Sequence, residues 1–312
     1  MADPADAPRP YLGGRVEQLV HEFPDQFADA DAEFDAARFV VVGLPYDATV
    51  SYRFGTKLGP AAIRQATWNL EQLNIRNGVD LREVPVHDMG DVQLDGLAPE
   101  KMFEAVEQAM RPVADAGKFL LPLGGEHSTI PPVVHALKRA HPDLKVLQLD
   151  AHLDYRREYQ GSIDNHACAM RRIADAVGPE SIVGIGIRSV ERAEHAEAIR
   201  DGFRFYTSFD VDRRGMGEVL HEALDHLGSG PLYVTLDIDG IDPAFAPATG
   251  TPEPFGLTPW QVLQAVKQTA PRLVGFDVNE VSPPWDAGNT AALAARIARE
   301  VISEVWAAQG PG

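Results

Sequence analysis

Short apolar runs alternate with amphipathic helical patterns along most of this chain, and this alternation restricts the fold more than any other feature. Eight runs have the length and the continuous apolar character of strands that are buried on both faces. The segments between them carry apolar residues at helical spacing. The predicted strands cover residues 39–43, 84–87, 119–123, 146–149, 182–187, 203–206, 232–236 and 273–278, and the predicted helices cover residues 60–73, 99–114, 130–140, 166–176, 193–200, 216–227, 259–269 and 290–307.

Strands that alternate with helices form a parallel sheet whose two faces are covered by the helices. The sequence therefore predicts an α/β fold with a parallel sheet of about eight strands. No low-complexity linker, internal repeat or shift in composition divides the chain. We expect a single domain over residues 36–312, preceded by an N-terminal arm over residues 1–35 with a short helix around residues 16–23.

Composition excludes several classes of function. The formal net charge of −18 argues against nucleic acid and anionic membrane surfaces as partners. It mildly favours a cationic substrate, although acidity that serves solubility explains the charge equally well. Cys168 is the only cysteine, so no intrachain disulfide can form and a cytoplasmic location is expected. The first ten residues lack the basic start and apolar core of a secretory signal, and no apolar run is long enough to span a membrane.

Polar clusters follow four of the predicted strands, at the point where each strand ends. The carboxyl ends of parallel strands meet at one edge of a sheet, where binding sites of open α/β sheets form. Four independent polar loops would not be expected to gather there so consistently. The clusters are GGEHS at residues 124–128, DAHLD at residues 150–154, DIDGIDP at residues 237–243 and NEVSP at residues 279–283.

The DAHLD segment carries three potential metal ligands. Asp150, His152 and Asp154 alternate with apolar residues, so the three side chains converge if strand geometry persists past Asp150. Converging carboxylates repel one another, and their burial is costly unless a cation neutralises them. The competing interpretation is a polar loop that follows a buried strand.

Other types of site are weighed against a metal centre. The chain has neither a GxxxxGK[ST] loop nor a GxGxxG turn after a strand. Gly124 and Gly125 could form an anion-binding nest. Ser128 lies beside His127, but no GxSxG nucleophile elbow is present. Asp237 and Asp239 form a DxD pattern that also occurs in metal–nucleotide sites.

Taken together, the ordered motifs resemble those of the ureohydrolases, the arginase and agmatinase family. The resemblance extends over residues 39–307, nearly the whole chain. It rests on GGEHS, DAHLD and DIDGIDP, on APATGTP at residues 246–252, on GPAAIR at residues 59–64 and on DMGD at residues 88–91.

The resemblance implies a three-layer α/β/α sandwich of the arginase and deacetylase type around an eight-stranded parallel sheet, and a binuclear manganese centre with two Mn²⁺ per chain. Asp150 and Asp237 would bridge the ions. Carboxylates and imidazoles suit such a hard-to-borderline divalent ion, and the single cysteine excludes an all-thiolate zinc site. By resemblance, one ion is bound by His127, Asp150, Asp154 and Asp237, and the other by Asp150, His152, Asp237 and Asp239.

The family mechanism assigns further roles. A manganese-bridged hydroxide would attack the guanidinium carbon, and Asp154 would accept its proton. Glu280 would pair with the guanidinium, unless it forms only a salt bridge at a strand end. His166 would move protons, or it would serve packing at a helix start. Its context, NHAC, departs from the His-Gly of many relatives and makes its role less certain.

The substrate is the least determined feature. Arginases carry an Asn where this chain has Arg156, so we expect an agmatinase of polyamine biosynthesis, which converts agmatine to putrescine and urea. An arginine at the mouth, Arg156 or Arg157, would instead suit a guanidino acid such as guanidinobutyrate or guanidinopropionate. Phe255, where many relatives have Gly, adds to the ambiguity. The candidates for binding the ammonium tail, which solvated surface positions would equally explain, are Glu158, Tyr159 and Glu191.

Two other classes stay open. The same fold family includes zinc-dependent deacetylases, whose mononuclear sites use fewer acids than the six apparent ligands here. A binding protein with a lapsed site is the alternative that is not an enzyme. By resemblance we expect a homotrimer or a homohexamer, with the arm as a candidate for subunit contacts.

Overall fold

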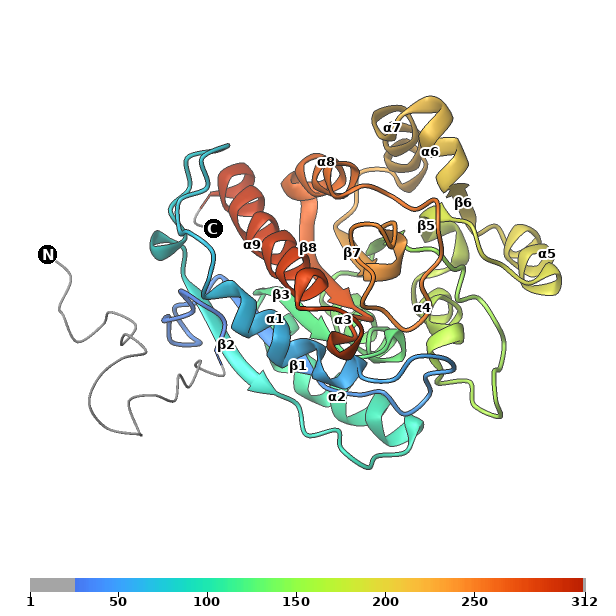
Figure 1. The fold of residues 1–312 in the computed structure, drawn as a ribbon, viewed down its shortest axis with the longest axis horizontal. Coiled ribbons are helices and arrows are strands. Elements are labelled where there is room, and N and C mark those ends of the chain that lie inside the picture. Colours follow the sequence, from blue (N-terminus) through green and yellow to red (C-terminus); the bar gives the residue numbers. More distant parts are fainter. Residues whose placement is uncertain (1–25, 311–312) are drawn as a thin grey trace, which may run out of the picture.

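The eight strands of the computed structural model, which describes residues 26–310, all run parallel in one sheet (Figure 1). Their order across the sheet is β2-β1-β3-β8-β7-β4-β5-β6. This confirms the predicted parallel sheet. The strands are β1 (Phe39–Leu44), β2 (Val86–Asp91), β3 (Phe119–Gly124), β4 (Lys145–Leu149), β5 (Ile182–Ile187), β6 (Arg204–Thr207), β7 (Leu232–Asp237) and β8 (Leu273–Asn279).

Helices cover both faces of the sheet and produce the expected three layers. Each face has its own apolar core, in which alternate residues of the strands pack against one helical layer. In Figure 1, α9 lies beside α1. One layer contains α1 (Gly59–Thr67), α6 (Ser208–Arg214), α7 (Met216–Leu227), α8 (Pro259–Thr269) and α9 (Asn289–Gln309), and the other contains α2 (Pro99–Asp115), α3 (Pro131–Ala140), α4 (Ala169–Val177) and α5 (Arg192–Asp201).

Several predicted boundaries differ from the structure. Helix α6, absent from the prediction, is short and begins with a capping box between Thr207 and Asp210. The helix predicted over residues 60–73 ends at Thr67, and the one predicted from residue 166 begins at Ala169, after a turn of 3-10 helix. Strand β2 extends to Asp91 because an edge strand tolerates polar residues.

The described end of the predicted arm packs against the sheet and α1. The side chain of Phe27 is buried in the core, and its backbone N–H donates to the carboxylate of Asp88 at 2.7 Å. The backbone N–H of Ala28 donates to the hydroxyl of Thr67 at 2.9 Å. The helix predicted around residues 16–23 lies outside the described residues, so the division into arm and domain stays a prediction.

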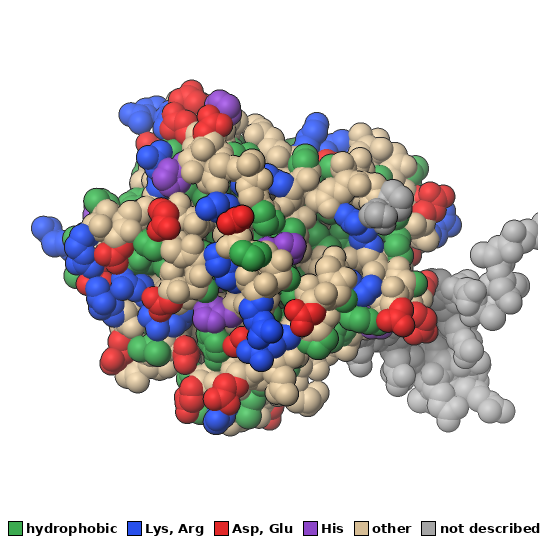
Figure 2. All heavy atoms as spheres, turned by 180° about the vertical axis from the view of Figure 1, so that it is seen from behind, with side chains coloured by type: hydrophobic (Ala, Val, Ile, Leu, Met, Phe, Trp, Pro, Cys, Tyr) green, Lys and Arg blue, Asp and Glu red, His purple; other side chains and the backbone are tan. Residues whose placement is uncertain are grey.

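The acidic side chains do not form one continuous patch on the face shown in Figure 2. Acidic and basic side chains are interspersed over that face. Between residues 26 and 310, no helix has both the length and the apolar character that a membrane crossing requires.

The order of the central strands explains how the polar motifs meet. Strands β3, β8, β7 and β4 are consecutive neighbours in the sheet, and each leads into one of the four clusters. Leu149 pairs with Leu236 and Asp237 pairs with Asn279, so these strands end nearly level. The motifs therefore form one continuous group at the carboxyl edge.

Candidate metal centre

The structure brings the six predicted ligands together in two groups whose ligand atoms lie within 4.8 Å of one another. The GGEHS segment after β3, the DAHLD segment after β4 and the DIDGIDP segment at the end of β7 each contribute ligands. One group consists of His127, Asp150, Asp154 and Asp237, and the other of Asp150, His152 and Asp239.

In the first group, the Nδ1 atom of His127 faces three carboxylates. It lies 2.9 Å from Oδ2 of Asp154, 3.3 Å from Oδ2 of Asp150 and 3.6 Å from Oδ2 of Asp237. All four residues are buried. Such a cluster of acceptors around one ring nitrogen requires a proton or a cation at its centre.

In the second group, the Nδ1 atom of His152 lies 3.1 Å from Oδ2 of Asp239 and 3.7 Å from Oδ1 of Asp150. Asp150 thus presents a different oxygen to each group, as a bridging ligand would. Asp237 belongs to the first group alone, so its expected role as a second bridge is not evident from these distances.

Loop geometry, rather than a continued strand, makes the DAHLD side chains converge. Strand β4 ends at Leu149, one residue before the first ligand. Beyond the strand, an isolated parallel bridge between His152 and Ser189 continues the pairing of β4 with β5. The backbone N–H of His152 also donates to Oδ1 of Asp150 at 2.7 Å. Asp154 has a φ of 49°, a left-handed conformation that is uncommon for non-glycine residues and that clusters at functional sites.

Two glycine positions of the motifs are required by close backbone approach. A Cβ atom on Gly125 would lie 2.1 Å from the carbonyl oxygen of Tyr46, and one on Gly240 would lie 2.8 Å from the backbone nitrogen of Asp150. Neither Gly124 nor Gly125 has a positive φ, which argues against the anion-binding nest. Ser128 is buried and its hydroxyl donates to the Glu126 carboxylate at 2.6 Å, and within residues 26–310 no histidine ring accepts its proton, which argues against a serine nucleophile.

The buried carboxylates lack basic partners other than histidine. Within residues 26–310, no Lys or Arg side chain forms an ion pair with any of them. Burial, followed by the charge of Asp150, raises the pKa of Asp154 to about 6. Burial alone would lower the pKa of His152, but the carboxylates of Asp239 and Asp150 raise it to about 10. Four carboxylates and two imidazoles in this arrangement fit divalent cations, which would supply the missing charge.

A buried polar chain holds the other ring nitrogen of His127. Its Nε2 atom lies 3.1 Å from Oγ1 of Thr235, whose hydroxyl donates to Oδ1 of Asp277 at 3.1 Å. Asn279 also donates to that oxygen, at 2.6 Å. Because the hydroxyl proton points to Asp277, Thr235 accepts from Nε2–H and leaves Nδ1 free for a metal.

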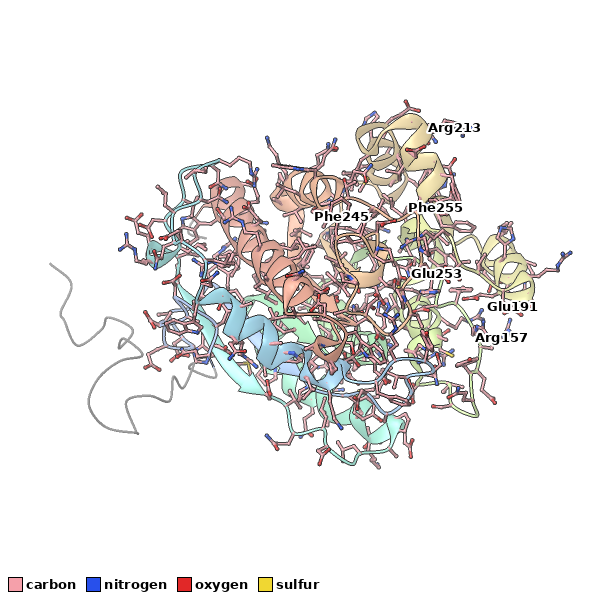
Figure 3. The ribbon with its side chains drawn as sticks, viewed as in Figure 1. Arg157, Glu191, Arg213, Phe245, Glu253 and Phe255 are labelled. Carbon is pink, nitrogen blue, oxygen red and sulfur yellow. The ribbon has the colours of Figure 1, made fainter. Side chains whose placement is uncertain are left out.

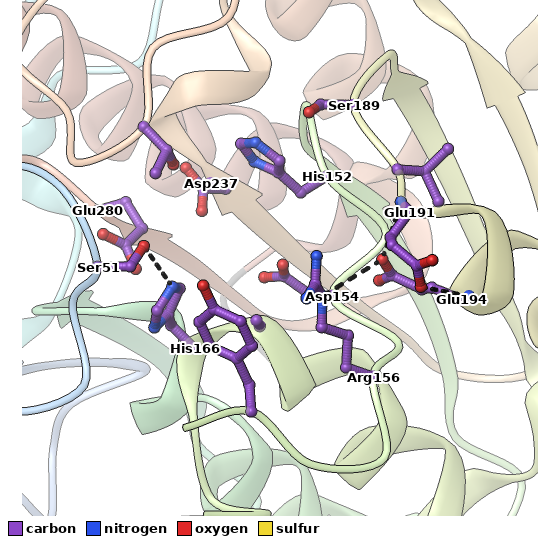
Figure 4. A pocket seen from close by; sticks show the side chains of 14 residues that line it. Ser51, His152, Asp154, Arg156, His166, Ser189, Glu191, Glu194, Asp237 and Glu280 are labelled. Atoms are coloured by element: carbon purple, nitrogen blue, oxygen red, sulfur yellow. Dashed lines mark hydrogen bonds and ion pairs between the residues drawn. The ribbon is translucent and has the colours of Figure 1, made fainter. Parts of the chain in front are cut away.

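A pocket of about 370 Å³ opens over the two groups (Figure 4). Of the other predicted site residues, His166, Glu280, Tyr159 and Glu191 line this pocket. Glu158 is exposed and is not among the lining residues. The remaining lining residues are Ser51, His152, Asp154, Arg156, Ala167, Ser189, Val190, Glu194, Asp237 and Thr251.

Arg156 and Arg157 differ in position. Arg156 lines the pocket, where its guanidinium lies over the Tyr159 ring and its Nε is 3.7 Å from Oε2 of Glu194. Arg157 is exposed and pairs with Glu197 at 2.9 Å, outside the pocket (Figure 3).

Glu194 is a pocket residue that the sequence analysis missed. It is buried, accepts a hydrogen bond from the backbone N–H of Tyr155 at 2.8 Å, and forms a capping box with Glu191 at the start of α5. Burial raises the pKa of Glu194. Hydrogen bonds from the backbone of Ala193 and of Glu194 lower the pKa of Glu191. In the sequence, the three-residue spacing of Glu191 and Glu194 before a helical pattern could have indicated the capping box, although not its place at the pocket.

Glu280 is buried at the pocket wall in a left-handed conformation, with a φ of 60°. Its Oε1 atom accepts the backbone N–H of His127 at 2.7 Å. Among the described residues it has no Lys or Arg partner, and burial raises its pKa well above the usual range. His166 lines another part of the wall, where burial, followed by the charges of His152 and His127, lowers its pKa to about 4. A neutral imidazole is therefore expected near pH 7.

The fold and the site define a class of three-layer α/β/α proteins in which carboxylates and histidines gather as a candidate metal centre at the carboxyl edge of the sheet. Within this class, the chain belongs to the arginase family, whose model matches residues 37–303. It is thus an arginase-family ureohydrolase, as the motifs indicated.

Individual relatives agree with this assignment. An agmatinase from Bacillus anthracis is 37% identical over 280 residues, with 88% of this chain and 94% of the relative covered. A guanidinobutyrase from Pseudomonas aeruginosa is 32% identical, with 87% of each chain covered. The crystal structure of the agmatine ureohydrolase of Thermoplasma volcanium is 38% identical, superimposes with a TM-score of 0.86, and matches 94% of this chain and 98% of its own.

Proposed function

We propose that this chain hydrolyses the guanidinium group of agmatine to putrescine and urea, and that it uses two Mn²⁺ ions. His127, Asp150, His152, Asp154, Asp237 and Asp239 would hold the ions. Similarity to the B. anthracis agmatinase and to the T. volcanium enzyme supports the substrate, and the two ligand groups support a pair of ions. When bound, such a pair lowers the pKa of water and supplies a nucleophile at neutral pH.

The observation that carries this proposal is the buried carboxyl group of Glu280 at the pocket wall, without a basic partner in the described chain. A guanidinium ion is planar, stays protonated and matches a carboxylate with two parallel N–H donors. Its binding would supply the countercharge that Glu280 lacks. The substrate carbon would then be held against the metal centre on the same wall.

Two further side chains would act on protons. Asp154, whose pKa is raised to about 6 by burial and by Asp150, is suited to accept a proton near neutral pH. His166 would deliver a proton to the leaving nitrogen. Both residues line the pocket that contains Glu280.

The pocket mouth favours a substrate with an ammonium tail. Two carboxyl groups, Glu191 and Glu194, line it together with the aromatic ring of Tyr159. One guanidinium, that of Arg156, is already close to Glu194 and stacked over Tyr159. The remaining acidic group suits the terminal amine of agmatine.

Hydrolysis of a guanidino acid is the second candidate. Arg156 lines the pocket, and its guanidinium could leave Glu194 to pair with a substrate carboxylate. A guanidinobutyrase is among the relatives.

Urea release by the Mn²⁺-loaded protein from agmatine, arginine, guanidinobutyrate, guanidinopropionate and guanidinoacetate tests the proposal. Turnover of agmatine well above the others is the expected result. Turnover of a guanidino acid would favour the second candidate, and no urea from any compound would contradict both. Metal analysis distinguishes the proposed ureohydrolase from the deacetylase alternative. Two ions per chain are expected, and one zinc per chain would contradict the binuclear centre.

A homotrimer or a homohexamer in the cytoplasm is also part of the proposal, by resemblance to the family. The N-terminal arm remains a candidate for subunit contacts. A chain that lacks residues 1–25 still contains Phe27, which is part of the core. Gel filtration of this chain tests the role of the arm, and an unchanged oligomeric state would argue against subunit contacts by the deleted residues.

A further inference from the structure

Glu126 is a buried carboxylate that lies outside both candidate metal groups. Its Oε2 atom accepts the backbone N–H of Thr49 at 2.7 Å, and its Oε1 atom accepts the hydroxyls of Thr49 and Ser128 at 2.5 and 2.6 Å. These contacts join the loop after β1 to the loop after β3. The carboxylate thus acts only as an acceptor, for three donor groups of two residues.

The hydroxyl of Thr49 connects this carboxylate to His166. Its oxygen accepts the backbone N–H of His166 at 3.0 Å and lies 3.1 Å from the Nδ1 atom of the same residue. A threonine hydroxyl has one proton and two lone pairs. The proton points to Glu126 and the backbone N–H occupies one lone pair, so only a lone pair remains for Nδ1.

We propose that Glu126, acting through Thr49, fixes the ring proton of His166 on Nδ1 and leaves Nε2 unprotonated at the pocket wall. Nε2 lies 3.4 Å from the hydroxyl of Ser51, which lines the same pocket (Figure 4). Glu126 and Thr49 are then positioning residues, because they act on His166 and do not line the pocket themselves.

The consequence for turnover rests on the proposed function. With Nδ1 protonated, the lone pair of Nε2 is free to take up, by way of solvent, the proton that the nucleophile loses and to pass it to the leaving nitrogen of the substrate, so that no proton is gained or lost overall. With the proton on Nε2 instead, the neutral ring has no lone pair on the side that faces the pocket. The position of one proton therefore decides whether His166 can act as a proton carrier.

The substitution Glu126→Gln should move this proton. The backbone N–H of Thr49 must face the amide oxygen, at the place of Oε2. The amide NH₂ group then replaces Oε1 and donates to the Thr49 hydroxyl, whose own proton has to turn toward Nδ1 of His166. Nδ1 becomes an acceptor, and the ring proton transfers to Nε2.

Nitrogen-15 NMR of the histidine-labelled full-length protein, loaded with diamagnetic Mg²⁺ at neutral pH, measures the position of the proton directly. His166→Gln identifies the His166 signals. We expect a protonated Nδ1 in the original protein and a protonated Nε2 in Glu126→Gln. Thr49→Val, which removes the hydroxyl at nearly constant volume, should give a mixture, and Thr49→Ser should retain the original state.

Ser128→Ala is the matched control, because it removes a donor to Glu126 that has no contact with His166. It should retain the protonated Nδ1. A protonated Nε2 in the original protein, or an unchanged Nδ1–H in both Glu126→Gln and Thr49→Val, would overturn the inference. Either result can be obtained without substrate, so it is independent of whether the proposed reaction occurs.

Kinetics then test the consequence. If agmatine is the substrate, Glu126→Gln should lower kcat about 10²-fold, the order expected for lost general acid–base catalysis, with little change in KM and an unchanged metal content. An equal kcat in a variant whose ring proton has moved would overturn the role in turnover.

Discussion

The Nδ1 atom of His127 and the Oδ2 atom of Asp150 lie 3.3 Å apart, and the other oxygen of Asp150 faces His152 at 3.7 Å. One carboxylate therefore takes part in both candidate metal groups. No other residue in the described part of the chain belongs to both.

This sharing makes Asp150 the most informative position for metal content. We expect Asp150→Asn to weaken binding of both ions by more than the 10- to 100-fold typical of residues behind the ligands, and to abolish urea release. Metal analysis after dialysis measures the loss. Asp225→Asn, at an exposed position on α7, is the control and should retain both ions. Retention of two ions by Asp150→Asn would contradict the assignment of the bridge, and unchanged function would favour the lapsed-site alternative.

Thr235 and Asp277 should act on the metal through His127. Thr235→Val leaves Nε2–H of His127 without its acceptor at 3.1 Å, so the ring can turn or change tautomer. Metal affinity should fall about 10- to 100-fold, as measured by calorimetric titration. Thr235→Ser retains the hydroxyl and should bind nearly as well as the original protein. Equal affinity in the valine variant would show that packing alone orients the ring.

Metal binding should release protons and should strengthen as the pH rises. The raised pKa of Asp154, about 6, means that the metal-free carboxyl group is protonated below that pH, so an incoming ion has to displace its proton. The pKa of His152, about 10, means that this ring also loses a proton to the ion at pH 7 to 8. Affinity should fall steeply below pH 6. Calorimetry in two buffers with different ionisation enthalpies counts the released protons, and identical heats in both buffers would contradict this prediction.

The fold was largely predictable because its signals are local. Each buried strand is a continuous apolar run, and each ligand motif begins where such a run ends, so the parallel sheet and the ligands followed from short segments. The contact between Glu126 and Thr49 was not predictable, since the two are 77 residues apart and meet only because β1 and β3 are neighbours. Glu194 was missed for the same reason: it reaches the pocket from the helix after β5.

Arg188 connects the end of β5 to the segments that contain Asp239 and Glu253, beside the metal centre, and should contribute to stability. Its guanidinium donates to the backbone carbonyls of Asp239 and Glu253, both at 2.6 Å, and to that of Gly186 at 3.0 Å. Lysine cannot reproduce this fork. Arg188→Lys should lower the free energy of unfolding by about 2 kcal/mol, as expected for buried carbonyls that lose their donors. Denaturant unfolding of the metal-free protein tests this, with the exposed Arg213→Lys as control (Figure 3).

The charge of Arg156 separates the two candidate substrates. If the tail of the substrate is an ammonium group, Arg156→Gln removes a repulsive charge from the pocket and should lower the KM for agmatine about two- to fivefold, the size of a partly screened charge interaction. If the tail is a carboxylate, the same change should raise the KM for guanidinobutyrate by a similar factor. Arg157→Gln is the matched control, because Arg157 pairs with Glu197 outside the pocket and should leave both values unchanged. A KM for agmatine that rises in Arg156→Gln and stays constant in Arg157→Gln would show that Arg156 supports the substrate instead of opposing it, and would contradict the role proposed for the acidic mouth.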